Sequence, residues 1–301
     1  MKFPQLNFPH VQQNTLAQLL YLSLSGEEMS RSEWAKQAHV GLTTAGKVAQ
    51  ALLEAGVVTE RFPPSFASGR KKGLLKTTSH CRFLVASVNE RGCHLTVTDG
   101  WGQKAEQSRL LPNADLTEGE NMLLYREAIA RWKSYLEEAY PLVGSMLTLP
   151  KEKMNDTKRN HFFSAWDVDF VLSQESCVRD MILDQYREKT VYYLSLDTDL
   201  YPVLYAKNKE IPCTPIPTQD FKSREAQLQK VIKGWYILRE MLPDPEMILW
   251  AKEPSPQDEE LLNKKLLART SNRVTYCTDL EMRGALHCLK KKIAESFSST
   301  I

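Results

Sequence analysis

The first quarter of the chain contains the pattern that most constrains its fold: two short amphipathic helices joined by a tight turn. Ser30 and Glu33 have the spacing of a capping box, in which both side chains bond backbone N–H groups at the start of a helix, and this predicts a helix over residues 31–38. A second helix is predicted from Gly41 to Gly56, because apolar residues recur at helical spacing and glycine commonly follows a helix C-terminus. The inward-facing residues of this second helix are Ala45, Val48, Ala49 and Leu52.

Regular structure is also predicted on both sides of these two helices. Residues 14–25 have leucines at helical spacing and Asn14 as a helix N-cap, so another helix precedes the pair. Beyond the pair, residues 57–59 are typical of a strand, prolines and a glycine mark a loop, and residues 74–77 are typical of a returning strand. Three helices followed by a two-stranded hairpin is the plan of a winged helix-turn-helix, which we assign to residues 1–80.

The second of the paired helices is predicted to read DNA. The major groove of DNA admits one α-helix, whose outward side chains contact the base edges. When the apolar stripe faces the core, Thr43 and Gln50 point outward and can bond bases. Leu42 can then touch a thymine methyl group, and Lys47 can reach a phosphate or a guanine. The small residue Gly46 leaves room for the groove to approach closely.

A dense basic run follows at the place where the loop of a winged helix lies. It consists of Gly69, Arg70, Lys71 and Lys72, with Lys76 close behind. An arginine beside a glycine can enter a narrow minor groove, where the potential is most negative, and we assign this role to Arg70. The side chains expected to contact DNA are Arg31, Leu42, Thr43, Thr44, Gly46, Lys47, Gln50, Arg61, Arg70, Lys71 and Lys72.

Each of these features also has a plainer interpretation. A pair of amphipathic helices is often an ordinary helical hairpin with a solvated polar face, and a run of charged residues is usually a solvated surface. The basic run lies directly after the helix-turn-helix pattern, and this position favours DNA binding over both interpretations. A scaffold whose winged helix binds protein is a further alternative, which the basic run argues against.

Composition limits what else the chain can be. It has 301 residues, of which 42% are hydrophobic, and a net charge of only +2, so any affinity for nucleic acid must come from a local patch. No apolar run is long enough to span a membrane and no signal peptide is recognisable, so we expect a cytoplasmic protein with no membrane partner. The six cysteines lack metal-binding spacing and are expected to be buried, inert thiols.

Residues 81–301 are predicted to form an α/β domain, because strand patterns alternate with helix patterns. Three prolines within residues 209–218 exclude regular structure there. Strands are predicted at 83–88, 94–98, 191–196, 202–206 and 247–250, and helices at 116–140, 175–187, 222–241, 256–268 and 280–297.

The residues of this domain do not indicate a metal site or an enzyme. Asp167, Asp169 and Asp180 could form a metal cluster. Asp167 and Asp169 alternate on one face of a predicted strand over residues 166–170, however, and we favour a solvated strand face. The sequence has no Gly-x-Ser-x-Gly motif of a serine nucleophile. We therefore expect no metal and no cofactor.

Four short motifs occur in a fixed order within residues 14–76. They are Ser30-Arg31-x-Glu33-Trp34-Ala35, Val40, Leu52-x-x-Ala55-Gly56-Val57-Val58 and Ser68-Gly69-Arg70-Lys71. This order and spacing resembles the start of regulators of the ROK family, named for repressor, open reading frame and kinase. His39 replaces the glycine usual in the family's turn, and Gly41 replaces the serine usual at the helix N-cap. Both residues tolerate these backbone positions.

Two segments near the C-terminus carry a second resemblance. Residues 242–249 are similar to the Asn-Pro-Glu-x-Ile-Val strand entry of the family, and residues 282–286 are similar to the start of its closing helix. The resemblance implies that residues 81–301 form a truncated, two-lobed, actin- and hexokinase-like (ribonuclease H-like) α/β domain. It further implies that this domain serves for dimerisation and for sensing a sugar-like effector.

The resemblance also implies that the chemistry of the kinase members is lost. Asn89-Glu90-Arg91-Gly92 replaces their phosphate-binding Asp-x-Gly-Gly-Thr turn, and residues 197–201, which include Asp197 and Asp199, replace their Gly-Thr-Gly-x-Gly loop. Glu175-Ser176 replaces the catalytic Asn-Asp pair, and the sugar-binding and zinc segment has no counterpart. We therefore expect a homodimeric, non-enzymatic repressor that binds double-stranded DNA. The alternative is a sugar kinase or other sugar-acting enzyme with an accessory DNA-binding domain.

Overall fold

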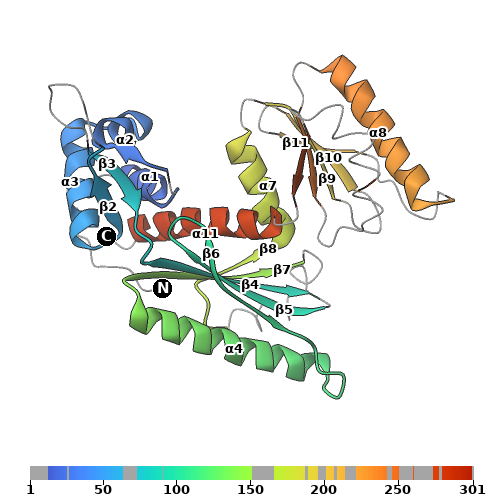
Figure 1. Cartoon of the computed structure of the whole chain (residues 1–301), viewed down its shortest axis with the longest axis horizontal. Helices are drawn as coiled ribbons and strands as arrows, with labels where there is room; N and C mark the ends of the chain where they lie inside the picture. Colours follow the sequence, from blue (N-terminus) through green and yellow to red (C-terminus); the bar gives the residue numbers. More distant parts are fainter. Residues whose placement is uncertain are drawn as a thin grey trace. The chain divides into compact units, whose positions relative to one another are not determined.

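A computed structural model shows two compact units, the first formed by residues 1–177 together with 285–301 and the second by residues 178–284. Each unit is described by itself (Figure 1). The structure describes residues 13–25, 27–63, 73–89, 91–150, 166–186, 189–195, 201–206, 209–213, 222–242, 246–250, 260, 274–277 and 280–299.

The first unit begins with three helices and a small antiparallel sheet of strand order β1-β3-β2. The predicted helices are present, but the first begins at or before Gln13, so Asn14 lies inside the helix and is not its N-cap. The elements are α1 (Gln13–Leu24), β1 (Met29–Ser30), α2 (Arg31–Gln37), α3 (Leu42–Glu54), β2 (Val58–Arg61) and β3 (Leu74–Thr77).

Local chemistry explains where α2 and α3 begin and end. Ser30 accepts a hydrogen bond from the backbone N–H of Glu33, and the Glu33 carboxylate accepts one from the backbone N–H of Ser30, so the predicted capping box is present. The turn that follows α2 contains His39 at φ 52°, a left-handed conformation that histidine tolerates better than most residues. Gly56 follows α3 at φ 71°, as predicted for a glycine that ends a helix.

The rest of the first unit is a five-stranded mixed sheet of order β6-β5-β4-β7-β8. Strands β4 and β5 match two predicted strands and α4 matches the predicted long helix, whereas β6, β7 and β8 are elements that the sequence patterns did not identify. Strand β7 pairs parallel with β4 and β8. The elements are β4 (Cys81–Asn89), β5 (Gly92–Asp99), β6 (Lys104–Leu110), α4 (Glu118–Ala139), β7 (Leu142–Leu149) and β8 (Phe170–Ser173).

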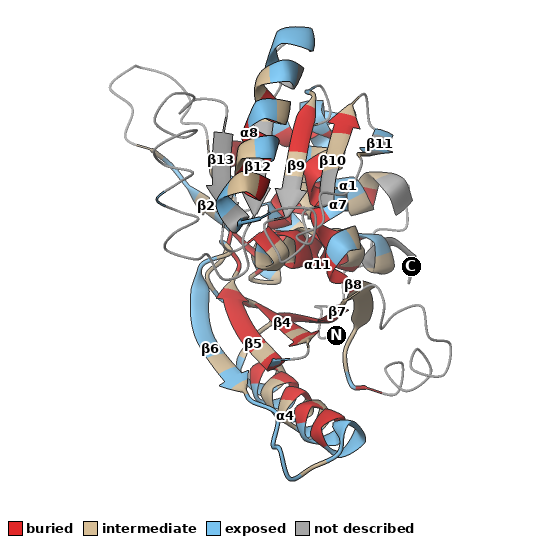
Figure 2. Ribbon diagram, turned by 90° about the vertical axis from the view of Figure 1, so that its right-hand side faces the viewer, coloured by how far each residue is buried: buried red, intermediate tan, exposed pale blue. Residues whose placement is uncertain are grey.

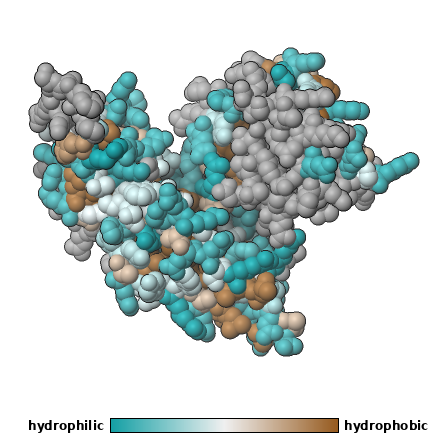
Figure 3. All heavy atoms as spheres, in the orientation of Figure 1, coloured by the Kyte–Doolittle hydropathy of each residue, from teal (hydrophilic) through white to brown (hydrophobic). Residues whose placement is uncertain are grey.

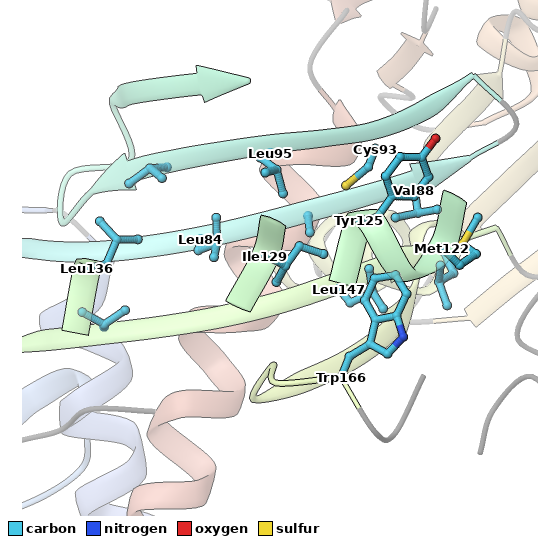
Figure 4. Packing of buried hydrophobic residues seen from close by; sticks show 14 residues of the cluster. Leu84, Val88, Cys93, Leu95, Met122, Tyr125, Ile129, Leu136, Leu147 and Trp166 are labelled. Atoms are coloured by element: carbon cyan, nitrogen blue, oxygen red, sulfur yellow. The ribbon is translucent and has the colours of Figure 1, made fainter. Parts of the chain in front are cut away.

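Helices cover both faces of this sheet. Helix α4 packs its buried face on one side, and Figure 2 shows its buried residues turned toward β4 and β5 while the opposite face is exposed. Figure 4 shows Ile129 and Leu136 of α4 among the side chains of the strands, including Leu84 and Leu147. On the other side, Gly144 of β7 lies against α11. Strand β7 is buried along its whole length, as expected for a parallel strand between two layers.

The second unit repeats this strand order. Its sheet runs β11-β10-β9-β12-β13, with antiparallel pairs on one side of β9 and parallel pairs on the other, just as in the first unit. A repeated five-stranded sheet with the same connections indicates a two-lobed α/β architecture. Its elements are β9 (Val191–Ser195), β10 (Tyr201–Ala206), β11 (Lys209–Pro212), α8 (Arg224–Met241), β12 (Glu246–Trp250) and β13 (Val274–Cys277). Two helices cross the boundary between the units: α7 (Gln174–Gln185) lies mostly in the second unit and α11 (Leu280–Ser299) mostly in the first.

One prediction for this unit was wrong. Residues 209–218 were expected to lack regular structure, yet residues 209–212 form β11 and pair with β10. Strand β11 lies at the sheet edge and Pro212 is its last residue, a place where a missing backbone N–H breaks no interior ladder. The helix predicted at 256–268 falls almost entirely outside the described residues. Among the described helices, none combines the length and the apolar character needed to cross a membrane.

Candidate nucleic-acid interface

Helix α3 has one buried face and one exposed face, divided as the sequence predicts. The stripe of Ala45, Val48, Ala49 and Leu52 is completely buried. The opposite face exposes Leu42, Thr43, Lys47 and Gln50, and Thr44 and Gly46 are half-buried at its edge. Leu42 retains 60% of its accessible surface, so its side chain is available for contact with a partner.

Helix α2 holds α3 at a fixed angle. Trp34 and Ala35 of α2 are buried in the core of the N-terminal bundle. The tight turn between the helices is closed by backbone hydrogen bonds from the N–H of Ala38 to the carbonyl of Trp34 (2.9 Å) and from the N–H of Val40 to that of Ala35 (2.9 Å). Because this turn is hydrogen-bonded and its packing is buried, the exposed face of α3 is presented by a rigid support.

The hairpin of β2 and β3 leads to the basic run. Residues 58–61 pair antiparallel with residues 74–77, so the chain between them returns to the same edge of the bundle. Arg61, the last residue of β2, is exposed. Arg70, Lys71 and Lys72, three of the predicted DNA contacts, lie outside the described residues.

Three of the predicted DNA contacts are bound to glutamates. Arg31 pairs with Glu60, with 3.0 Å between Nη2 and Oε2, and Arg61 pairs with Glu28 at 2.5 Å. The Gln50 amide donates a hydrogen bond to the Glu54 carboxylate (3.0 Å). The sequence analysis missed all three glutamates. The spacing of four residues on one helix could have revealed Glu54, whereas the other two pairs join segments about thirty residues apart in sequence.

The N-terminal bundle is docked on the remainder of the first unit. The Trp101 indole N–H, in the turn between β5 and β6, donates to the carbonyl of Thr77 at the end of β3 (2.6 Å). The Lys76 ammonium lies 4.5 Å from the centre of the Trp101 ring, a cation–π contact. Tyr21 of α1 contacts His287 of α11, with 3.2 Å between the hydroxyl and Nδ1. The candidate interface is therefore carried by a bundle that is fixed to its neighbour.

The segments compared with kinase phosphate loops are only partly described. Asn89 pairs with Gly92 across a tight β4–β5 turn, and its side-chain oxygen accepts a hydrogen bond from the backbone N–H of Arg91 (2.8 Å). Glu175 lies in the first turn of α7. Glu90 and residues 197–199 are outside the described residues.

The aspartates considered as a metal cluster have other roles, and the expected solvated strand face was wrong. Residues 166–169 precede β8 and are not a strand, and Asp169 is buried and accepts hydrogen bonds from the backbone N–H and hydroxyl of Ser145. Lys133 of α4 pairs with both Asp167 (2.8 Å) and Asp169 (3.4 Å). Burial lowers the pKa of Lys133, but these carboxylates outweigh burial and raise the pKa above its usual value. Within the described ranges, no three potential ligands are grouped to hold a metal.

Four cysteines are buried free thiols, as expected: Cys81, Cys93, Cys177 and Cys288. Cys213 is also a free thiol but is only half-buried, so the expectation of burial was wrong for this residue. Cys81 and Cys93 are buried, and burial raises the pKa of Cys81 to about 11 and that of Cys93 to about 12. Since the thiolate is the reactive form, both side chains are unreactive at neutral pH.

The first unit also exposes apolar side chains around α4. On the face shown in Figure 3, brown side chains gather near the N-terminal end of this helix, where Leu111, Leu123 and Leu124 are exposed. Further along α4, a pocket of about 280 Å³ is lined by Glu106, Arg131, Trp132 and Tyr135. None of the predicted DNA contacts lines this pocket.

Comparison with solved structures shows the fold. A ROK family transcriptional regulator, described as a homologue of the Escherichia coli Mlc protein, aligns with a TM-score of 0.58 at 10% identity, over 96% of this chain and 98% of its own. The two chains therefore share a fold over their whole length.

Two further solved structures align less well, each with a TM-score of 0.44. A ROK family protein from Streptococcus pneumoniae in complex with sucrose is 10% identical over 70% of this chain and 99% of its own. A polyphosphate/ATP-glucomannokinase from an Arthrobacter species is 12% identical over 73% of this chain and 99% of its own. No protein-family profile and no curated protein sequence matches the chain.

Proposed function

We propose that this chain is a transcriptional regulator of the ROK family that binds specific sequences of double-stranded DNA through an N-terminal winged helix-turn-helix. The observation that carries the proposal is the exposed face of α3, with Thr43, Lys47 and Gln50 outward on a helix whose other face is completely buried. A buried, hydrogen-bonded brace and a hairpin leading to a basic run accompany it. These are the parts with which a winged helix reads the major groove and contacts the flanking backbone.

The shared fold supports this proposal. The alignment with the regulator covers 96% of this chain, so it includes the N-terminal bundle as well as the α/β part. By analogy with the family alone, repression is the proposed outcome of DNA binding. Arg70 is proposed to enter the minor groove, and Lys71 and Lys72 to contact phosphates.

The proposed regulator acts as a homodimer and without catalysis. Two linked half-sites raise affinity by making the second binding event intramolecular, which is why helix-turn-helix proteins commonly dimerise. The α/β part is proposed to hold the two copies together and to bind a sugar-like effector. Its role as an enzyme is disfavoured because the segments that replace the kinase phosphate loops bring in Glu90, Asp197 and Asp199, whose charges repel phosphate.

Selection of bound DNA from a random pool tests the proposal. Purified full-length chain is mixed with random duplexes, and bound duplexes are recovered and sequenced through several rounds. The proposal predicts an enriched motif with two related half-sites about ten base pairs or a multiple apart, because a symmetric dimer places its two reading helices one helical turn apart. A pool without any enriched motif contradicts sequence-specific binding.

A further inference from the structure

Three of the side chains proposed to bind DNA are each held by a glutamate when DNA is absent. Glu60 holds Arg31, Glu28 holds Arg61, and Glu54 holds Gln50 through a hydrogen bond to its amide. Two of these pairs therefore occupy guanidinium groups, and the third occupies the amide best placed to read a base.

The two arginine pairs hold the hairpin from opposite sides. Glu60 and Arg61 are neighbours in β2, and successive residues of a strand point to opposite faces of the sheet. Glu60 reaches the first residue of α2, whereas Arg61 reaches Glu28, which precedes β1. Gly73 leaves the space that the Glu60 carboxylate fills, because an added β-carbon would overlap that carboxylate.

A phosphate group can compete for these arginines. The Arg31 side chain is 35% exposed and that of Arg61 is 62% exposed, so both pairs are in contact with water and are weak. A phosphate accepts the same two-pronged hydrogen bonds from a guanidinium as a carboxylate does. A glutamate that remained paired with its arginine would also repel the approaching phosphate, because both groups are negatively charged.

We propose that Glu28 and Glu60 set the affinity of this interface for DNA of any sequence, and that Glu54 restrains base reading by Gln50. This inference rests on the DNA-binding function proposed above. Phosphates displace Glu28 and Glu60 from Arg61 and Arg31 when DNA docks, and the cost of that exchange lowers affinity uniformly, because the backbone carries no sequence information. Glu54 acts at a base-reading side chain, so its effect depends on sequence.

The test uses the full chain, the motif enriched from the random pool and a scrambled duplex of equal length. Glu28→Gln and Glu60→Gln are each expected to strengthen binding to both duplexes about threefold to tenfold near 0.1 M salt, with a smaller gain at higher salt because ions screen exposed charges. Glu27→Gln is the matched control, since it removes the same charge one residue from Glu28 and outside the three pairs. It should give less than half of that gain.

A double substitution separates phosphate binding from a structural role. In the Glu60→Gln background, Arg31→Ala should abolish the gain in affinity and reduce the salt dependence by about one phosphate contact. Glu54→Ala should change the preference at one or two base positions and should change the affinity for the scrambled duplex no more than Glu27→Gln does.

The inference is overturned if Glu28→Gln and Glu60→Gln bind no tighter than Glu27→Gln, or if Arg31→Ala costs nothing in the Glu60→Gln background. Either result would leave sequence-specific binding by the wild-type chain intact. If instead the wild-type chain binds neither duplex, the proposed function itself fails, and this inference with it.

Discussion

Gly46 lies in the middle of α3, where glycine destabilises a helix by about 1 kcal/mol relative to alanine. A β-carbon added at Gly46 would meet no atom within 4 Å apart from the neighbouring backbone of its own helix, so packing within the protein does not require a glycine there. The residue lies at the edge of the exposed face, beside Thr43 and Lys47. We attribute the presence of a glycine at position 46 to a close approach by DNA.

Gly46→Ala is therefore expected to separate stability from binding. The variant should unfold at a higher urea concentration, with a gain of about 0.5–1 kcal/mol, because alanine restricts the unfolded chain and favours the helix. It should bind the enriched motif at least tenfold more weakly, because the new methyl group lies where the groove approaches. A variant that gains stability and binds as tightly as wild type would remove Gly46 from the interface.

Lys290 of α11 is a buried cation whose charge depends on pH. Burial lowers its pKa to about 8 from a usual value of 10.5. Its ammonium donates to the carbonyl of Gly100 (3.3 Å) and lies over the ring of Phe83. Below about pH 8 the side chain is protonated in the folded and unfolded chain alike. Between about pH 8 and 10.5 only the unfolded chain holds the proton.

The contribution of Lys290 to stability should therefore rise as the pH rises through this window. Lys290→Met removes the titration, so the free energy of unfolding of the variant minus that of wild type should fall between pH 8 and 10, by at most about 1.4 kcal/mol per pH unit. Urea unfolding of both proteins at several pH values measures the difference, and background titrations of groups that do not interact with Lys290, such as Cys93, cancel in it. A difference that stays constant across the window would show that the pKa of Lys290 is normal.

At the scale of elements, the sequence predicted those whose periodicity is strong or whose ends carry specific residues. Helix α3 and its exposed face followed from the spacing of apolar residues and from Gly56. Strand β6 was missed because Lys104–Leu110 is mostly exposed and polar, and only its pairing with β5 makes it a strand. Strand β7 was missed because Leu142–Leu149 is buried on both faces and shows no alternation.

Only the part of the candidate site that depends on local spacing could be predicted from the sequence. Its α3 face depends on local spacing, which a sequence displays directly. The glutamates that hold Arg31 and Arg61 depend on how the hairpin folds back against the start of α2, and no local pattern reports such a contact. The prediction that Asp169 lies on a solvated strand face failed for a related reason, because its partners Ser145 and Lys133 lie on distant elements.

The turn of residues 99–103 is one of the elements that fix the N-terminal bundle to the rest of the first unit. Trp101→Ala removes both the hydrogen bond to Thr77 and the contact with Lys76. Backbone amides of β3 should then exchange with solvent faster, while those of β7 should not change, because opening is local. Hydrogen exchange followed by mass spectrometry measures both segments in one experiment. Unchanged exchange in β3 would mean that the bundle is held by other contacts, such as that between Tyr21 and His287.

At the scale of the whole molecule, the same five-stranded plan occurs in both units. A fold does not by itself determine function. Side chains must therefore determine whether the α/β part is an enzyme or part of a regulator. A nucleoside triphosphate needs turns whose N–H groups point at its phosphates and positive charge to balance them. Glu90, Asp197 and Asp199 offer the opposite charge.

Calorimetric titration with magnesium-ATP, alone and with a panel of hexoses, should accordingly show no binding at micromolar concentration and no phosphoryl transfer. The same protein sample should bind the enriched DNA motif, which controls for its integrity. Micromolar binding of ATP, or sugar phosphorylation that a point change in residues 81–301 abolishes, would favour the kinase interpretation over the regulator.

The central claim is that the exposed face of α3 reads DNA, and a salt-dependent binding titration of Lys47→Ala and Gln50→Ala tests it most directly. Fluorescence anisotropy is measured for each protein with the enriched motif, with single-base variants of it and with a scrambled duplex. Gln50→Ala should lose about 1–3 kcal/mol of discrimination at one or two base positions. Lys47→Ala should weaken binding to all duplexes alike and reduce the salt slope by about one. If both variants bind every duplex as wild type does, α3 is not the reading helix and the account is contradicted.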